Sequence, residues 1–323
     1  MDEEIHKEAL ALADTVAKHT KPNDKIGYFD FLLGAVSPPS GHKRMRGGYK
    51  IWPEGSGDPS LTLRLMTLGN STGVWPKANW SQQVAEALVA EGTPTTVFHG
   101  AGKGATSTQE VLRVLRDAPG IEPHAIFSLS GITDIGYLML PPNNPFAQKY
   151  VRRVMNFLAD TNLVSDVLFG YPVHRSPAAN WCHNQRMAKI IANGLGIPYF
   201  VFLQPVQGYG KYKQTPEERK FFESKAKVVL HAIGKPYGDC VIEFYEEVKE
   251  IIKASPEDFS HVIDFTDVFS DCPGAYRDHR HQNEVGIAHL AKNMLPVVRE
   301  CLLTSGIELP NAEISSRSGR LLK

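Results

Sequence analysis

The chain has 323 residues, of which 42% are hydrophobic and 22% charged, so it can bury a sizeable core and disorder is not the expected state. Its 35 basic residues balance 35 acidic ones, which argues against a protein that holds nucleic acid or an anionic membrane by its overall field. No run of about 18 uncharged apolar residues occurs, so we expect no membrane span.

The N-terminus and the cysteines indicate the compartment. The first residues are acidic and contain no apolar run, so no secretory signal peptide is predicted and a cytoplasmic protein is expected. The four cysteines are widely spaced with no C-x-x-C pair, which excludes a Cys-rich zinc module and a thioredoxin-like motif. Free, mostly buried thiols are the simplest interpretation, although two disulfides remain open.

The first 60 residues differ in composition from the rest. Apolar residues recur at helical spacing over 3–18, which predicts an amphipathic helix. Residues 19–60 are rich in Gly, Pro and charge, so we expect a long irregular segment there. We therefore treat 1–60 as an N-terminal helix and lead-in, outside the main domain.

From residue 61 onward, short apolar segments alternate with helical patterns. Strands are predicted at 61–68, 95–99, 125–130, 199–203 and 262–265. Helices are predicted at 81–91, 108–116, 146–160, 184–195, 216–233, 241–254 and 284–303. This alternation predicts an α/β protein, a three-layer αβα sandwich with a central parallel sheet of about five strands.

The domain boundaries follow from these elements. One domain is expected over 61–305, with 306–323 as a C-terminal tail. The segment 204–260 is longer than a single crossover requires, so it is a candidate helical insertion or cap.

Three short polar loops follow the first three predicted strands: GNSTG, GAGKGATS and GITD. Ligands of parallel α/β folds bind at the carboxyl ends of the strands, so these loops should converge on one site. GAGKGATS fails as a P-loop at both ends and matches a dinucleotide fingerprint only weakly. A glycine-rich strand-to-helix turn can nevertheless offer backbone N–H groups to a negative oxygen.

Two further segments carry candidate catalytic residues. Ser71 lies in the turn after the first strand, where a lone serine could equally be a helix cap. Asp278 and His281 lie three residues apart before the last helix, so the carboxylate can orient the imidazole and leave its other nitrogen free as a base. The alternatives are a charged surface loop and a metal site at His279 and His281, for which no third ligand is evident.

Taken in chain order, these segments resemble those of the SGNH (GDSL-type) hydrolases, whose fold is a flavodoxin-like αβα sandwich. The resemblance covers roughly residues 61–300. It implies that Ser71 is the nucleophile and that Asp278 and His281 complete the triad. It also implies that Gly104, in the second block, and Thr133, in the G-x-N-D block, join Ser71 in binding the oxyanion.

Two positions depart from the family pattern. Asn70 replaces the aspartate of the G-D-S block, and Thr133 replaces the asparagine of the G-x-N-D block. A threonine hydroxyl is a shorter and less fixed donor than an amide, and losing one oxyanion donor can cost about 10²–10³ in rate. Either Thr133 substitutes imperfectly, or a neighbour such as Asn79 or Asn180 supplies the donor, or the chemistry differs.

The resemblance implies a serine esterase that needs no cofactor or metal. The sequence pattern of this chain resembles that of members linked with bacterial glycan metabolism. This resemblance favours a carbohydrate O-acyl ester as the substrate, most simply one with an O-acetyl group. The alternatives are an O-acyltransferase with the same triad and a non-catalytic glycan-binding scaffold. A small-molecule or glycan ester is the expected partner, with nucleic acid and membrane not expected and the oligomeric state open.

Other side chains are candidates for substrate contact. Basic residues of the lead-in could contact an anionic substrate, and aromatic residues near the site loops could stack on sugar rings, although solvated loops and core packing are the commoner roles. The basic candidates are Lys43, Arg44, Arg46 and Lys50. The aromatic candidates are Trp75, Trp80, Tyr137, Trp181 and Tyr209.

Overall fold

A computed structural model gives the fold. It describes residues 28–30, 34–36, 49–53, 62–74, 79–102, 105–139, 176–230 and 234–309. The helices predicted at 3–18 and 146–160 and most of the tail lie outside these residues.

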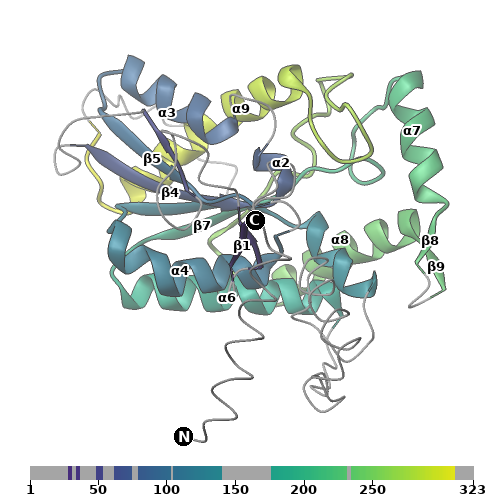
Figure 1. The fold of residues 1–323 in the computed structure, drawn as a ribbon, viewed down its shortest axis with the longest axis horizontal. Helices are drawn as coiled ribbons and strands as arrows, with labels where there is room; N and C mark the ends of the chain where they lie inside the picture. Colours follow the sequence, from purple (N-terminus) through teal and green to yellow (C-terminus); the bar gives the residue numbers. More distant parts are fainter. Residues whose placement is uncertain are drawn as a thin grey trace, which may run out of the picture.

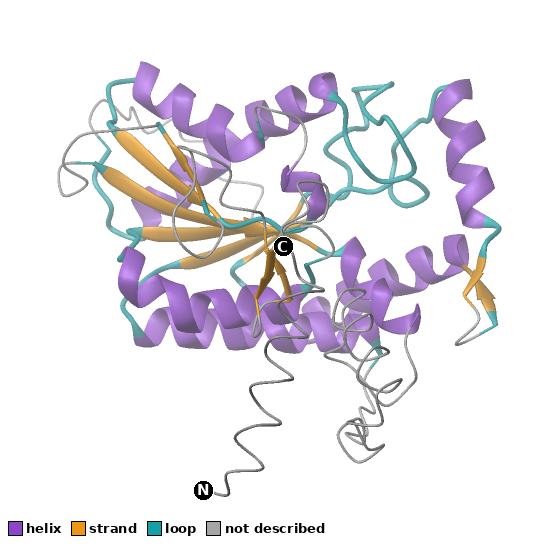
Figure 2. Ribbon diagram, in the orientation of Figure 1, coloured by secondary structure: helices purple, strands orange, loops and turns teal. Residues whose placement is uncertain are grey.

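The centre of the molecule is a six-stranded sheet in the order β10-β7-β6-β4-β5-β3. Its parallel strands are β4 (Leu63–Gly69), β5 (Thr95–His99), β6 (Ala125–Ser130), β7 (Tyr199–Leu203) and β10 (Val262–Asp264). They match the five predicted strands to within two residues, and helices cover both faces of the sheet (Figure 1, Figure 2). The predicted α/β sandwich is therefore confirmed.

The sixth strand comes from the segment expected to be irregular. β3 (Lys50–Trp52) pairs antiparallel with β5 at the sheet edge, with Ile51 opposite Phe98. Three residues are too few to show an alternating pattern, so the sequence did not indicate this strand. A separate two-stranded hairpin is formed by β1 (Tyr28–Asp30) and β2 (Gly34–Val36).

Helices form a layer on each face of the sheet. On one face lie α4 (Ser107–Ile121), α6 (Pro177–Gly194) and α8 (Tyr237–Ala254), where α6 packs against both of the others. On the other face, α3 (Trp80–Ala90) packs against α9 (Glu284–Thr304). Side-chain caps begin three of these helices: Asn79 before α3, Ser176 before α6 and Asn283 before α9.

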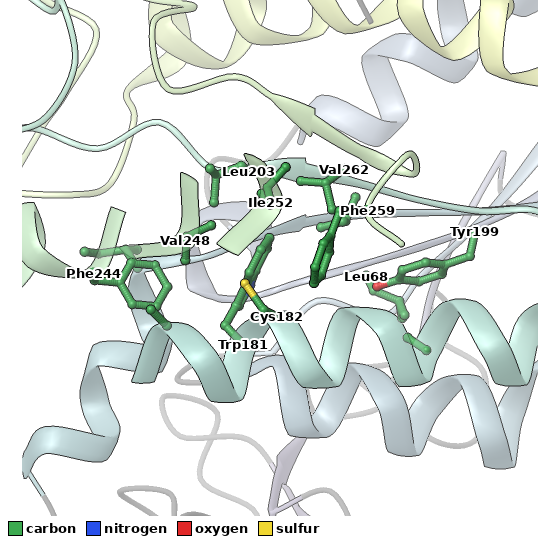
Figure 3. Close-up of a cluster of buried hydrophobic side chains, with 14 of the residues drawn as sticks. Leu68, Trp181, Cys182, Tyr199, Leu203, Phe244, Val248, Ile252, Phe259 and Val262 are labelled. Carbon is green, nitrogen blue, oxygen red and sulfur yellow. The ribbon is translucent and has the colours of Figure 1, made fainter. Parts of the chain in front are cut away.

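Each layer has its own apolar core. Figure 3 shows part of the first, in which Trp181 and Cys182 rise from α6 toward the sheet residue Leu203 and side chains of α8 such as Val248. Trp181 is fully buried and its indole N–H donates to Ser130 Oγ at 3.0 Å. The second core joins α3 and α9 across β4, β5 and β6. All four cysteines are free and buried, which settles the open question of disulfides.

The segment 204–260 contains one layer helix and additional elements. α7 (Pro216–Ala226), β8 (Val229–Leu230) and β9 (Lys235–Pro236) precede α8, and α7 packs against α8. Figure 1 shows α7 and the β8–β9 hairpin at one end of the molecule, beyond the carboxyl ends of the strands. Among the helices that the structure describes, none is long and apolar enough to cross a membrane.

Candidate active site

Ser71 stands where β4 ends. It begins α2 (Ser71–Val74), a single turn at the end of the strand, and it is 8% exposed. Gly69, with φ at +148°, makes the bend, and a Cβ there would lie 2.7 Å from the carbonyl oxygen of Leu129 on β6. Because β4 lies between β5 and β6, the loops after both neighbours flank Ser71.

The turn is fixed from beneath by Asn70, which is 1% exposed. Its Oδ1 accepts from the Thr72 amide at 3.0 Å and from the Thr72 hydroxyl at 2.9 Å. Its Nδ2 donates to Gln204 Oε1, directly after β7, at 2.7 Å. The residue that replaces the family aspartate therefore shapes the turn and bonds it to a neighbouring strand end.

Ser71, His281 and Asp278 form a continuous hydrogen-bonded chain. Ser71 Oγ lies 2.8 Å from His281 Nε2. His281 Nδ1 lies 2.7 Å from Asp278 Oδ2 and 3.0 Å from Oδ1. With the proton on Nδ1 bonded to Asp278, Nε2 is the acceptor that faces the serine hydroxyl. The three residues predicted as a triad are thus brought together from positions 210 residues apart.

The Asp278 carboxylate also organises its own loop. Oδ1 accepts from the amides of Arg280 at 3.0 Å and His281 at 2.8 Å, which closes a tight turn around the side chain. Burial alone would raise the pKa of Asp278, but the hydrogen bonds from His281 and from these two amides outweigh it and hold the pKa well below its usual range. Asp278 is therefore ionised at neutral pH and stabilises positive charge on His281.

The segment after β7 anchors this loop, a role that the sequence did not reveal. Gln207 Nε2 donates to the Asp278 carbonyl oxygen at 2.8 Å. Glu218, in the first turn of α7, is 2% exposed and accepts from Tyr212 Oη at 2.5 Å and from the Tyr276 amide at 2.9 Å. The T-x-x-E capping box at Thr215 signals a helix start, but nothing local indicates that its glutamate also holds a distant loop.

The loop after β5 approaches the nucleophile from one side. The amides of Gly100 and Gly102 bond the carbonyl oxygens of Thr67 at 2.7 Å and Gly69 at 3.1 Å, so the loop continues alongside the end of β4. Gly104, the predicted oxyanion donor, lies outside the described residues. The loop leads into α4 through a capping box at Thr106.

Thr133 approaches from the other side. It lies in the 3-10 segment η3 (Ile132–Met139), which follows β6, and it is 9% exposed. Among the described residues, none forms a hydrogen bond with its hydroxyl. Its position after the neighbouring strand end is the one that the resemblance assigns to an oxyanion donor.

Buried carboxylates lie beneath this second side. Asp134 accepts from the Ser107 hydroxyl at 2.5 Å and from the Ser107 amide at 3.0 Å, which joins η3 to the start of α4. Asn184 Nδ2 donates to the same hydroxyl at 2.8 Å. Burial raises the pKa of Asp134 well above its ordinary value, Ser107 opposes this, and nearby Glu110 adds to it. Burial also raises the pKa of Glu110 to about 7.

Several sequence candidates occupy other roles. Asn79 is 4% exposed and its Oδ1 caps α3 by accepting from the Gln82 amide at 2.9 Å, while Asn180 lies in the first turn of α6. Trp80 and Trp181 are core residues at 1% and 0% exposure, so neither offers a face to a sugar ring. Tyr209 stacks on Tyr245 with centroids 4.9 Å apart.

Five further candidates lie outside what the structure describes, four of them entirely and one by its side chain. These are Lys43, Arg44, Arg46, Trp75 and the Tyr137 side chain. Lys50 is described, and it lies half-buried in β3. No group of three metal-binding side chains occurs in the described ranges.

Comparisons with known proteins return similarity in structure only. No protein-family model matches the chain, and no curated protein matches it. An acetyl xylan esterase, AlAXEase, has a TM-score of 0.45 and 12% identity over 73% of this chain and 99% of its own. A putative acylhydrolase from Bacteroides fragilis has a TM-score of 0.45 and 11% identity, covering 74% and 88%.

A third similar structure is a catalytic mutant of an acetylxylan esterase from Geobacillus stearothermophilus. Its TM-score is 0.42, with 15% identity over 77% of this chain and 97% of its own. With TM-scores below 0.5 and identities of 15% or less, these structures do not assign a role to any residue of this chain. The chain resembles the SGNH hydrolases, and the weight of that resemblance lies in its own strand order and in the positions of Ser71, Asp278 and His281.

Proposed function

We propose that the protein is a serine hydrolase of carboxylic esters, with Ser71, His281 and Asp278 as its catalytic triad. The observation that carries the proposal is the unbroken hydrogen-bonded chain from Ser71 Oγ through the His281 ring to the Asp278 carboxylate. A nucleophile, a base and a group that orients the base are the parts that acyl transfer through serine requires.

The proposed reaction has two stages. Ser71 Oγ attacks the acyl carbon while its proton passes to His281 Nε2, and Asp278 stabilises the resulting imidazolium. The amides of Ser71 and Gly104 and the Thr133 hydroxyl are the proposed donors to the oxyanion. The C–O bond then breaks as His281 returns the proton to the leaving alcohol. Water, activated by the same histidine, finally hydrolyses the acyl-serine.

The proposed substrate is a carbohydrate that carries an O-acyl group, most simply O-acetyl. This class follows from the family resemblance of the sequence. The same triad would transfer the acyl group to a sugar hydroxyl if an acceptor reached the acyl-serine before water did.

A turnover assay tests the proposal. Acetate release from acetylated mono- and oligosaccharides is measured for the wild type and for Ser71→Ala, with and without added sugar acceptors. The account predicts release by the wild type and loss of release in Ser71→Ala with the fold intact by circular dichroism. An acyl product that appears only on the acceptor would identify a transferase. Equal activity of the two proteins would refute the role of Ser71.

A further inference from the structure

A cationic cluster lies beside the triad loop, outside the machinery described so far. It consists of Lys225 at the end of α7, Tyr237 at the start of α8, and His279 and Arg280 in the loop. Lys225 Nζ lies 5.4 Å from the centroid of the Tyr237 ring, and the His279 ring packs edge-on against it at 5.8 Å. His279 Nδ1 is 3.9 Å from Asp278 Oδ1, so the cluster adjoins the triad directly.

The positive charges of this cluster have no acid of their own. Two nearby cations are paired: Lys249 of α8 lies 2.8 Å from Asp264, and Lys235 of β9 lies 2.6 Å from Glu243. Within the described ranges, neither Arg280 nor Lys225 forms an ion pair. Asp278, which lies beside His279, is already engaged by His281 and two amides.

One nitrogen of the Arg280 guanidinium is buried without a hydrogen-bond partner among the described residues. This nitrogen is Nε, whereas Arg280 and Lys225 as whole residues are each partly exposed. A buried donor of a charged group that lacks a hydrogen bond is destabilising, and an anion bound at the guanidinium would offset part of that cost.

The pKa of His279 reflects both its burial and the positive charges beside it. Burial and then the Arg280 guanidinium lower the pKa of His279 to about 4, with Asp278 opposing and Lys225 adding to the lowering. His279 is therefore neutral at pH 7, although an aspartate lies beside it. Burial disfavours a charge of either sign, whereas the contributions of Arg280 and Lys225 are those of positive charges close to His279.

The cluster lies on the leaving-group side of the proposed reaction. His281 must return its proton to the alcohol oxygen, so the alcohol portion of the ester lies against His281 in the transition state. His279 and Arg280 immediately precede His281 in the same tight loop. A charged group on the alcohol, and not on the acyl chain, would therefore reach Arg280 and Lys225.

We propose that Arg280 and Lys225 form a subsite for an anionic group on the alcohol portion of the substrate, which makes the preferred substrate an O-acylated acidic sugar. This inference rests on the proposed ester hydrolysis and narrows its substrate class. It involves residues other than the basic positions of the lead-in. The Arg280 guanidinium offers two parallel donors that fit a carboxylate, and Lys225 supplies a second charge.

Two matched esters test the subsite. The ratio of kcat/KM for an O-acetylated methyl glucuronoside to that for the O-acetylated methyl glucoside is measured in the wild type, Arg280→Gln and Lys225→Gln. We expect a wild-type ratio of about ten or more and a fall of about tenfold in each variant, because each removes a charge-assisted hydrogen bond. Lys227→Gln, an exposed residue that ends the same helix, is the matched control and should leave the ratio unchanged.

The ratio separates recognition from a structural role. If Arg280 only supported the loop, Arg280→Gln would slow both esters equally and the ratio would not move. A wild-type ratio near one would overturn the inference while leaving ester hydrolysis in place.

If neither ester is turned over, the proposed ester hydrolysis fails. A binding measurement then tests the subsite on its own. Calorimetry with Ser71→Ala compares methyl glucuronoside with methyl glucoside. Tighter binding of the glucuronoside that is lost in Ser71→Ala/Arg280→Gln supports the subsite, whereas equal or absent binding of both sugars overturns it.

Discussion

The two sides of Ser71 are built on different principles. The triad side is a loop from the end of the chain whose charged groups are partly exposed, with the Asp278 side chain at 40%, and whose bonds form one continuous path. The proposed oxyanion side is buried. Beneath it lie Asp134 and Glu110, which form no ion pair with any residue that the structure describes. Ser71, Asp278 and His281 match the SGNH pattern that the sequence resembles, whereas Thr133, on the side proposed to bind the oxyanion, departs from it.

The largest expected effect is on the triad side. Asp278→Asn keeps the shape but removes the charge that orients His281, so kcat/KM for ester hydrolysis should fall by about 10⁴-fold. Asp271→Asn is a matched control, because Asp271 contacts His289 at 3.2 Å on the exposed surface. Full activity in Asp278→Asn would show that the path through His281 is not the catalytic one.

On the oxyanion side, Thr133→Val tests whether the hydroxyl is a donor. We expect a fall of about 10²-fold in kcat, since one of several donors is lost. Thr133→Asn, which restores the family amide, should retain the activity of the wild type. If Thr133→Val were fully active, the departure at this position would be harmless and another group would supply the donor.

The buried acids should make the oxyanion side sensitive to pH. Burial raises the pKa of Glu110 from its ordinary value of 4.5 to about 7, so the folded state favours the protonated acid. The stability that this protonated acid contributes is fully present below about pH 4.5 and is lost as the pH rises through 7. The free energy of unfolding should fall by about 3 kcal/mol over that range.

Urea unfolding of Glu110→Gln between pH 4.5 and 8 measures this contribution. The amide can still accept from Gln185, which bonds Glu110 at 2.9 Å, so the variant should be more stable than the wild type at pH 8 and lose less stability as the pH rises. Glu250→Gln, an exposed change on α8, is the control. Parallel pH profiles for Glu110→Gln and the wild type would contradict the account.

A smaller effect, on the stability of the protein, is expected from changes to the turn beneath Ser71. Asn70→Ala removes three hydrogen bonds and leaves Gln204 Oε1 buried without a donor, so stability should fall by about 1–3 kcal/mol. Asn79→Ala, which removes the cap of α3 away from the triad, provides a comparison of similar size. A catalytic loss in Asn70→Ala that exceeds the loss in Asn79→Ala would show that the turn also positions Ser71.

The sequence was informative where periodicity is strong or where motifs match a known pattern, as for Ser71 and His281, and silent on distant contacts that belong to no motif. The strands at 95–99, 125–130 and 199–203 were predicted at their observed bounds, because apolar runs between turn residues define them. β3 was missed because three residues carry no period. The supporting roles of Gln204, Gln207 and Glu218 depend on contacts across 58 to 134 residues, which no local pattern encodes.

The most direct test of the central claim is covalent labelling of the nucleophile. Intact mass is recorded after treatment with a fluorophosphonate for the wild type, Ser71→Ala and the control Ser224→Ala, an exposed serine on α7. The account predicts one adduct on the wild type and on Ser224→Ala and none on Ser71→Ala. A folded wild-type protein that remains unlabelled, or a Ser71→Ala variant that is still labelled, would contradict it.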